Sequence, residues 1–93
     1  MTVREYVLDV AVAKSPQELH DLMARTFNLP DYYGRNWDAF DECFSELPLP
    51  ATVRVTGMWV LERRLSKEAH FLRTCLAQAQ ADAPQGQLTV NVA

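Results

Sequence analysis

Basic charge, cysteine and long apolar runs are all scarce in this sequence. Nine Lys and Arg stand against twelve Asp and Glu, which gives a formal net charge of −3. A chain without a net positive field gains nothing from releasing counterions around a nucleic acid, so we do not expect direct RNA or DNA binding. No apolar run has the length of a membrane span, and Arg4, Glu5 and Asp9 interrupt the apolar stretch near the start. We therefore expect neither a membrane helix nor a secretory signal, and predict a cytoplasmic protein.

The two cysteines give no sign of a metal or redox site. Cys43 and Cys75 lie on segments with helical patterns and belong to no CxxC or Cys/His cluster. Isolated cysteines usually behave as small apolar side chains, so we expect two buried free thiols. The sequence also has no phosphate-binding loop, HExxH helix or zinc cluster, and hence it predicts no cofactor.

The size and the order of the predicted elements indicate one α/β domain spanning residues 1–93. At this length, with 48% hydrophobic residues, only one core can form. "VREYVLDV", "ATVRVTG" and "QLTVNV" have the composition of strands, and the first is apolar enough to be buried on both faces. Because helical patterns separate the strands, we predict a three-stranded parallel sheet with right-handed crossovers, packed with about four helices.

Capping signals locate three of the helices. Ser15, followed by Glu18 three positions later, predicts a capping box at the start of the first helix, which should end before Leu29-Pro30. Asn36 is the predicted N-cap of a second helix of about ten residues. Ser66 opens the longest helix, and "MWVLERRLS" before it is expected to be a short helical or mixed segment.

The segment "PDYYGR" before the second helix is predicted to be a turn. Gly34 is expected to take a backbone conformation closed to other residues. Adjacent residues on a turn rarely both point inward, so we expect one of Tyr32 and Tyr33 to be buried and the other exposed. An exposed tyrosine beside carboxylates is a common anchor of protein interfaces.

The second helix is expected to separate an apolar side from an acidic side. At helical spacing, one side carries Trp37, Phe40 and Phe44, with Cys43 at its margin, and the other carries Asp38, Asp41, Glu42 and Ser45. A carboxylate is favoured near the helix start, as at Asp38, but Asp41 and Glu42 repel it at a cost of about 0.2–0.5 kcal/mol per pair. Arg35 is the only cation close in sequence. A helix face that carries only negative charge favours association with a positively charged cleft.

The other candidate residues have simpler interpretations. His20 and His70 lack a nucleophile or carboxylate at a telling spacing and are expected at the surface or boundary. Trp59 is expected to pack, and Arg63 with Arg64 to be a solvated basic pair.

The stretch "LPDYYGRNWDAFDECF" resembles the barstar family, protein inhibitors of barnase-type ribonucleases. The resemblance implies a three-stranded parallel sheet with helices packed on it. It also implies that the second helix and the turn before it plug a ribonuclease active site, with carboxylates standing where RNA phosphates bind. The positions that match family contacts are Tyr32, Gly34, Asn36, Asp38 and Glu42.

The sequence departs from the family pattern at several interface positions. Asp41 stands where the best-studied member has a tryptophan, and Glu42 replaces its most deeply inserted aspartate. The segment "SELPLP" is shorter and lacks a further interface tryptophan, and Gln78 replaces a contacting glutamate on the later helix. We include Asp41 and Gln78 among the expected partner-binding residues, and expect a non-enzymatic inhibitor, a monomer by itself, in a 1:1 complex with a basic extracellular ribonuclease.

Two other functions remain open at this point. The chain could be a regulatory interaction module of the same family whose partner is not a nuclease. It could also be a metal-dependent enzyme that uses Asp38, Asp41 and Glu42 as oxygen ligands for Mg²⁺ or Ca²⁺, although no nucleophile or base stands beside them in the sequence.

Overall fold

The computed structural model, which describes residues 2–93, contains a three-stranded parallel sheet. Its strands are β1 (Arg4–Asp9), β2 (Ala51–Thr56) and β3 (Leu88–Val92), in the spatial order β1-β2-β3. β1 pairs with β2 from Arg4↔Ala51 onward, and β2 pairs with β3 from Ala51↔Leu88 onward. The predicted α/β fold with a parallel sheet is therefore confirmed, while the first residue of the predicted domain lies outside the described part.

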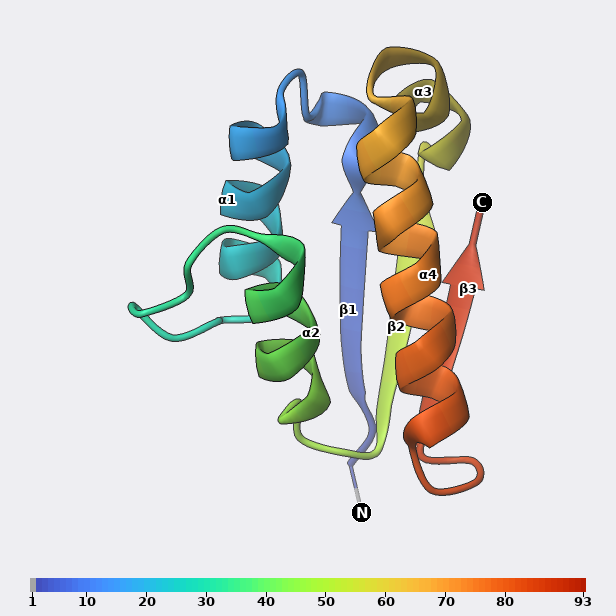
Figure 1. Cartoon of the computed structure of the whole chain (residues 1–93). Coiled ribbons are helices and arrows are strands. Elements are labelled where there is room, and N and C mark those ends of the chain that lie inside the picture. Colours follow the sequence, from blue (N-terminus) through green and yellow to red (C-terminus); the bar gives the residue numbers. More distant parts are fainter. Residues whose placement is uncertain (1) are drawn as a thin grey trace.

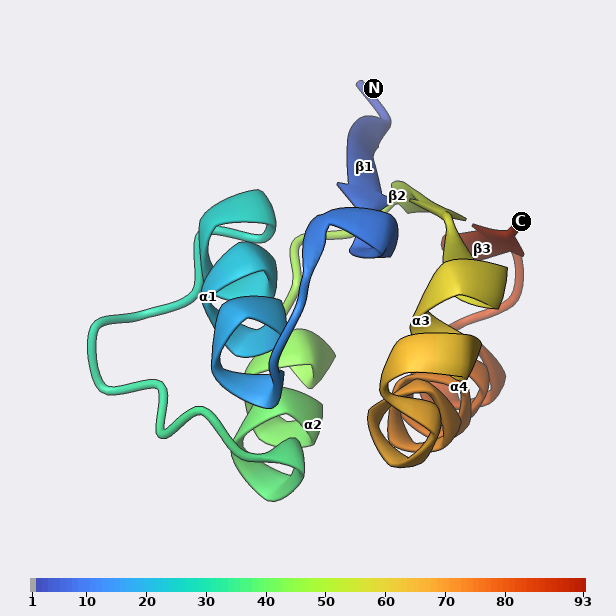
Figure 2. The same ribbon diagram turned by 90° about the horizontal axis from the view of Figure 1, so that it is seen from above.

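Helices fill the connections between the strands. The elements are the 3-10 turn η1 (Val10–Val12) and the helices α1 (Pro16–Thr26), α2 (Trp37–Ser45), α3 (Met58–Arg64) and α4 (Ser66–Asp82). Figure 1 shows α1 and α2 beside β1 and α4 along β2, and Figure 2, seen from above, shows all the helices on one side of the sheet. None of the helices within residues 2–93 is long and apolar enough to span a bilayer.

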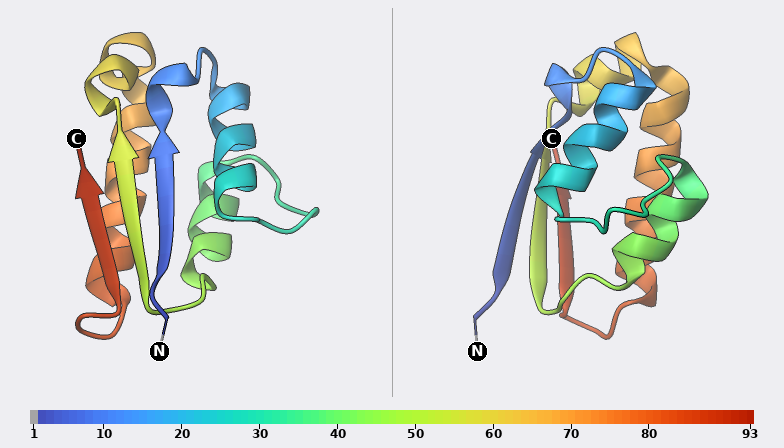
Figure 3. Two further views of the ribbon diagram at one scale, coloured as in Figure 1. Left: turned by 180° about the vertical axis from the view of Figure 1, so that it is seen from behind. Right: turned by 90° about the vertical axis from the view of Figure 1, so that its left-hand side faces the viewer.

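Only one face of β1 is buried, so the prediction of a strand buried on both faces is wrong. Leu8 points to the helices and is fully buried, whereas its neighbour Val7 is 62% exposed. The edge-on view in Figure 3 shows why, because the sheet has helices on one face and none on the other. β1 also ends at Asp9, whose side chain accepts a hydrogen bond from the Ala11 amide at 3.2 Å and starts the 3-10 turn.

The core lies between the sheet and the helices and is rich in aromatic rings near α2. Phe40 and Phe44 are buried and stack with their ring centroids 5.1 Å apart. Phe27, just after α1, meets the ring of Phe44 edge-on at 5.1 Å. The predicted apolar side of α2 is thus confirmed, with Trp37 half-buried beside it.

The predicted caps explain where α1 and α2 begin. The Ser15 hydroxyl accepts a hydrogen bond from the Glu18 amide at 3.1 Å, and the Asn36 side chain accepts one from the Ala39 amide at 2.8 Å. The Glu18 carboxylate reaches the Lys14 amide instead of the Ser15 amide, a small difference from the expected capping box. These bonds satisfy amides that a helix start leaves without partners, and they fix the direction in which each helix leaves its turn.

Candidate partner-binding surface

The turn at residues 30–36 joins α1 to α2 and projects from the body of the protein (Figure 1). Tyr33 is buried, only 3% exposed, and its hydroxyl is hydrogen-bonded to Nδ1 of His20 on α1. Tyr32 next to it is 79% exposed. The prediction of one buried and one exposed tyrosine is confirmed, and the buried one attaches the turn to α1.

His20 is buried, so its expected place at the surface or boundary is wrong. Only 4% of His20 is exposed. Its ring packs against the rings of Tyr33 and Trp37, and the centroids of the His20 and Trp37 rings are 4.8 Å apart. Burial lowers the pKa of His20, and the charge of Arg35 adds to this, while the carboxylates of Glu68 and Asp21 oppose it. The helical spacing of His20 to Met23 on α1 and to Phe27 just after it is the signal that could have predicted its burial.

The turn adopts a conformation different from the one expected at Gly34. The left-handed backbone occurs at Arg35, with φ of 52°, and not at the glycine. The Arg35 side chain donates from Nε to Asp21 Oδ1 on α1 at 2.6 Å, which holds this residue in place. Asn36 closes the turn from the other side, because its Nδ2 donates to the Gly34 carbonyl at 3.3 Å while its Oδ1 caps α2.

The acidic face, which we define as Asp38, Asp41 and Glu42, lies on the outer side of α2. All three side chains are exposed, opposite the buried side of the helix. Neither of the ion pairs formed within residues 2–93, Arg35–Asp21 and Arg73–Glu62, involves them. Arg35, the nearest cation in sequence, is directed to α1 instead. Within residues 2–93, therefore, no ion pair offsets the charges of the acidic face.

Helix α4 packs against α2 and brings Gln78 to the neighbouring surface. Gln78 is exposed, and its amide donates to Asp82 Oδ1 at 3.0 Å. The structure thus gathers the turn residues and the acidic face along one continuous segment, and places Gln78 on the adjacent helix.

Both cysteines are free, as predicted, but half-buried instead of buried. Burial raises the pKa of both thiols, and neighbouring carboxylates add to the effect: Glu42 and Glu46 at Cys43, and Asp41 and Asp38 at Cys75. A raised pKa keeps a thiol protonated and weakens it as a nucleophile. Asp41 also lies near α4, because it lines the same pocket as Asp82.

Trp59 and Arg64 differ from their predicted roles. Trp59 is 63% exposed, because the neighbouring Met58 and the later Leu61 form the buried side of α3. Arg64 donates from Nη1 to two backbone carbonyls, each at 2.8 Å, and so ties α3 to the segment after β1. Arg63 and His70 are exposed, as expected.

The three carboxylates of α2 are not arranged as a metal site. In the part of the chain that the structure covers, no group of three or more His, Cys, Asp or Glu side chains is placed to hold a metal ion. The arrangement of Asp38, Asp41 and Glu42 offers charge spread along a helix instead of convergent ligands.

Comparison with known families agrees with the topology and with the motif of the turn and α2. Residues 3–93, essentially the whole chain, match the family described as Barstar (barnase inhibitor). A search among curated proteins gave no match. The family match covers every element of the sheet and all the helices around it. The chain therefore belongs to the barstar family.

Proposed function

We propose that this protein is a non-enzymatic inhibitor of a basic, barnase-type extracellular ribonuclease. The observation that carries the proposal is the acidic face of α2, which is exposed and forms no ion pair within residues 2–93, although Arg35 stands three residues before Asp38. A ribonuclease must bind RNA phosphates with basic side chains, so its active site attracts such a face.

The acidic face acts by occupying the positions of the RNA phosphates. Asp38, Asp41 and Glu42 present carboxylates along one side of a short helix, and their joint charge accelerates the encounter with a basic cleft. Inside the cleft, charge-assisted hydrogen bonds from basic side chains to the carboxylates slow dissociation. Glu42, near the middle of the exposed side, is expected to contribute most.

The turn supplies an apolar contact beside the charges. Tyr32 is largely exposed, and the turn that carries it is attached to α1 at two points, Tyr33 to His20 and Arg35 to Asp21. A contact that is already ordered before binding loses less conformational entropy when the complex forms. Tyr32 is therefore expected to act as an anchor at the edge of the acidic face.

The inhibitor is expected to act in the cytoplasm and to form a 1:1 complex. Such a complex would protect a cell from its own ribonuclease before that enzyme is exported. This role requires binding alone, without a catalytic group on the inhibitor.

The first experiment is a pull-down with the purified protein from lysate and from secreted fractions, followed by affinity measurement with the protein recovered. We expect a small basic ribonuclease, whose activity falls as the complex forms. The Asp38→Ala, Glu42→Ala double variant should bind it far more weakly, and raising the ionic strength should slow association of the wild type.

Glu5→Ala is the matched control for Glu42→Ala. Glu5 is an exposed glutamate on β1, outside the turn and α2, so its removal changes the charge by the same amount at a different place. We expect Glu5→Ala to keep near wild-type affinity. If Glu5→Ala and Glu42→Ala lose affinity equally, net charge alone explains the effect. Recovery of a partner that is not a nuclease would contradict inhibition and favour a regulatory interaction.

A further inference from the structure

The sheet has two free edges, and the two differ in charge. β1 and β3 are the outer strands of the sheet formed within residues 2–93, so each pairs with β2 on one side only. The edge at β1 carries Arg4, Glu5 and Asp9, and charged side chains commonly protect an edge strand from pairing with another chain. The edge at β3, Leu88–Val92, has no charged residue and no proline. β3 is therefore the edge to which a further strand can be added.

Alternate residues of β3 direct their backbone groups away from β2. The Ala93 amide donates to the Val55 carbonyl at 2.8 Å, so the odd-numbered residues of this segment bond to β2. Backbone groups alternate in direction along a strand. The amides and carbonyls of Leu88, Val90 and Val92 therefore point to the free edge.

A pocket of about 290 Å³, here called the edge pocket, lies beside this edge, between α4 and β3. Figure 3 shows β3 as the outermost strand with α4 on one face of it. Val92 is apolar yet 38% exposed, and Val90 is half-buried. The edge pocket is lined by Arg73, Leu76, Ala77 and Gln80 from α4, and by Val90 and Val92 from β3. It thus offers apolar contact to the side chains of an added strand.

One side chain of α4 covers part of the edge. The Val90 amide donates a hydrogen bond to Oε1 of Gln80 at 2.7 Å, so this amide is directed to an acceptor outside the sheet. Gln80 is exposed, and its bond can be exchanged for one to the carbonyl of an added strand. Such an exchange costs little free energy, because one hydrogen bond replaces another.

The pattern of edge groups fits a second copy of the same strand. In an antiparallel pair, two residues that lie opposite each other can exchange both amide-to-carbonyl bonds. When Val90 of one copy lies opposite Val90 of the other, Leu88 lies opposite Val92, and every edge-facing amide and carbonyl of β3 has a partner. No like charges meet in this arrangement, because β3 is uncharged. Val90 of each copy then lies against the edge pocket of the other.

We propose that two copies of this protein associate by antiparallel pairing of their β3 strands, which forms one continuous sheet with two-fold symmetry. α1 and α2 lie beside β1, at the opposite edge (Figure 1), so each copy keeps its partner-binding surface free. The inference is therefore independent of the proposed function and compatible with one ribonuclease bound to each copy.

The size of the contact indicates a weak dimer. Two strands of five residues and one pocket on each copy bury less than the roughly 1,600 Å² of a typical stable complex. The dimer therefore forms reversibly at high protein concentration, and the monomer expected from the sequence is the form at low concentration.

Sedimentation equilibrium at increasing protein concentration tests the association. We expect the wild-type mass to rise from 10.6 kDa towards twice that value. Val92→Lys places a charge opposite Leu88 of the other copy at two symmetric positions, and should weaken association about tenfold. Val7→Lys is the matched control, because it changes an exposed valine on the other edge strand, and should associate as the wild type does. A wild type that stays at 10.6 kDa, or equal loss in both variants, would overturn the proposal.

Gln80→Ala tests the exchange of hydrogen bonds at the edge. The Val90 amide then gives up no bond within its own chain, so this variant should associate about fivefold more tightly than the wild type. Gln78→Ala, which removes an exposed glutamine of α4 outside the edge pocket, should have no effect. Thermal melts identify the conditions in which each variant is folded. Weaker association of folded Gln80→Ala would overturn the pairing at Val90.

Amide hydrogen exchange measured by NMR locates the contact. The amides of Thr89 and Asn91 bond to β2 within each copy, so they should be protected at every concentration. The amides of Leu88 and Val92 should exchange rapidly in the monomer and become protected as the dimer forms. If the mass doubles without any change in their exchange, the dimer uses another surface and the inference is wrong.

Discussion

Removing one hydroxyl group from the core should test how the turn at residues 30–36 is held in place. In Tyr33→Phe the ring stays, so its packing is kept, but the hydrogen bond to His20 Nδ1 is lost. His20 is 4% exposed, and its ring nitrogen then has no hydrogen-bond partner in a largely apolar setting. A buried polar group left without its partner costs about 1–3 kcal/mol, and we expect the free energy of unfolding to fall by that amount.

Urea unfolding, followed by circular dichroism at pH 8, measures this change. In a domain of this size each kcal/mol corresponds to roughly 4–8 °C in the melting temperature, so thermal melts should show the same loss. Tyr32→Phe is the matched control, because it removes the same hydroxyl from an exposed ring without a hydrogen bond to another part of the chain. Its stability should stay within about 0.5 kcal/mol of the wild type.

The same variant separates the role of the turn in stability from its role in binding. If the bond between Tyr33 and His20 keeps the turn in its binding conformation, Tyr33→Phe should also weaken binding of the ribonuclease at a temperature where the variant is fully folded. Unfolding free energies that are equal for Tyr33→Phe and Tyr32→Phe would refute the reasoning, because they would show that the buried bond contributes nothing.

Three further changes have expected outcomes. Phe40→Ala should lower the free energy of unfolding by about 3–5 kcal/mol in urea titrations, because this fully buried ring fills the centre of the core. Asn36→Ala should lower it by about 1 kcal/mol in thermal melts, since the cap of α2 is lost. Burial lowers the pKa of His20 from 6.5. The unfolded chain therefore takes up this proton first, and stability should decrease as the pH falls below about 6.5 but not in His20→Gln.

Local signals were sufficient to predict α1, α2 and the strands. The hydroxyl of Ser15 and the amide of Asn36 make the capping bonds that the sequence indicates. The spacing of Phe40 and Phe44 likewise determines which side of α2 is buried. Each of these features depends on residues within one or two helical turns, so a single sequence contains the information.

The open face of the sheet could not be predicted because it depends on strand order. A right-handed crossover places its helices on a face that is set by the direction in which the chain moves across the sheet. With the strand order β1-β2-β3, the chain crosses the sheet in the same direction from β1 to β2 and from β2 to β3. The helices of both crossovers therefore lie on the same face, and Val7 on the other face stays exposed. An order that reversed direction would have covered both faces.

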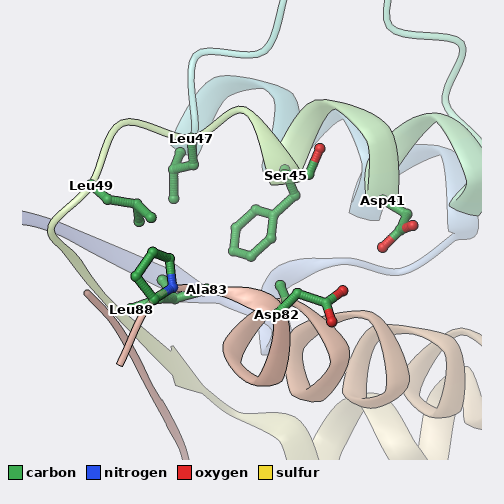
Figure 4. Close-up of a pocket in the computed structure, with 10 residues that line it drawn as sticks. Asp41, Ser45, Leu47, Leu49, Asp82, Ala83 and Leu88 are labelled. Carbon is green, nitrogen blue, oxygen red and sulfur yellow. The ribbon is translucent and has the colours of Figure 1, made fainter. Parts of the chain in front are cut away.

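Long-range contacts account for the remaining differences. The left-handed conformation of Arg35 accompanies an ion pair with Asp21, fourteen residues earlier, and the exposure of Trp59 follows from which side of α3 meets the core. Asp41 on α2 and Asp82 on α4 line one pocket (Figure 4), although they are far apart in the chain. Neither composition nor helical spacing specifies such contacts, because they depend on how whole elements pack.

The energetics of α2 explain how a helix can carry unneutralised charge. Repulsion of Asp38 by Asp41 and by Glu42 costs about 0.2–0.5 kcal/mol for each pair. Burying a phenylalanine side chain contributes about 1.5–3 kcal/mol, and α2 buries two, Phe40 and Phe44. The stability of the helix is therefore set by its inner side and by the cap at Asn36. Because the repulsion on the outer side costs so little free energy, α2 can carry charges that complement a basic partner without a large loss of stability. The proposed binding function is therefore compatible with a stable fold.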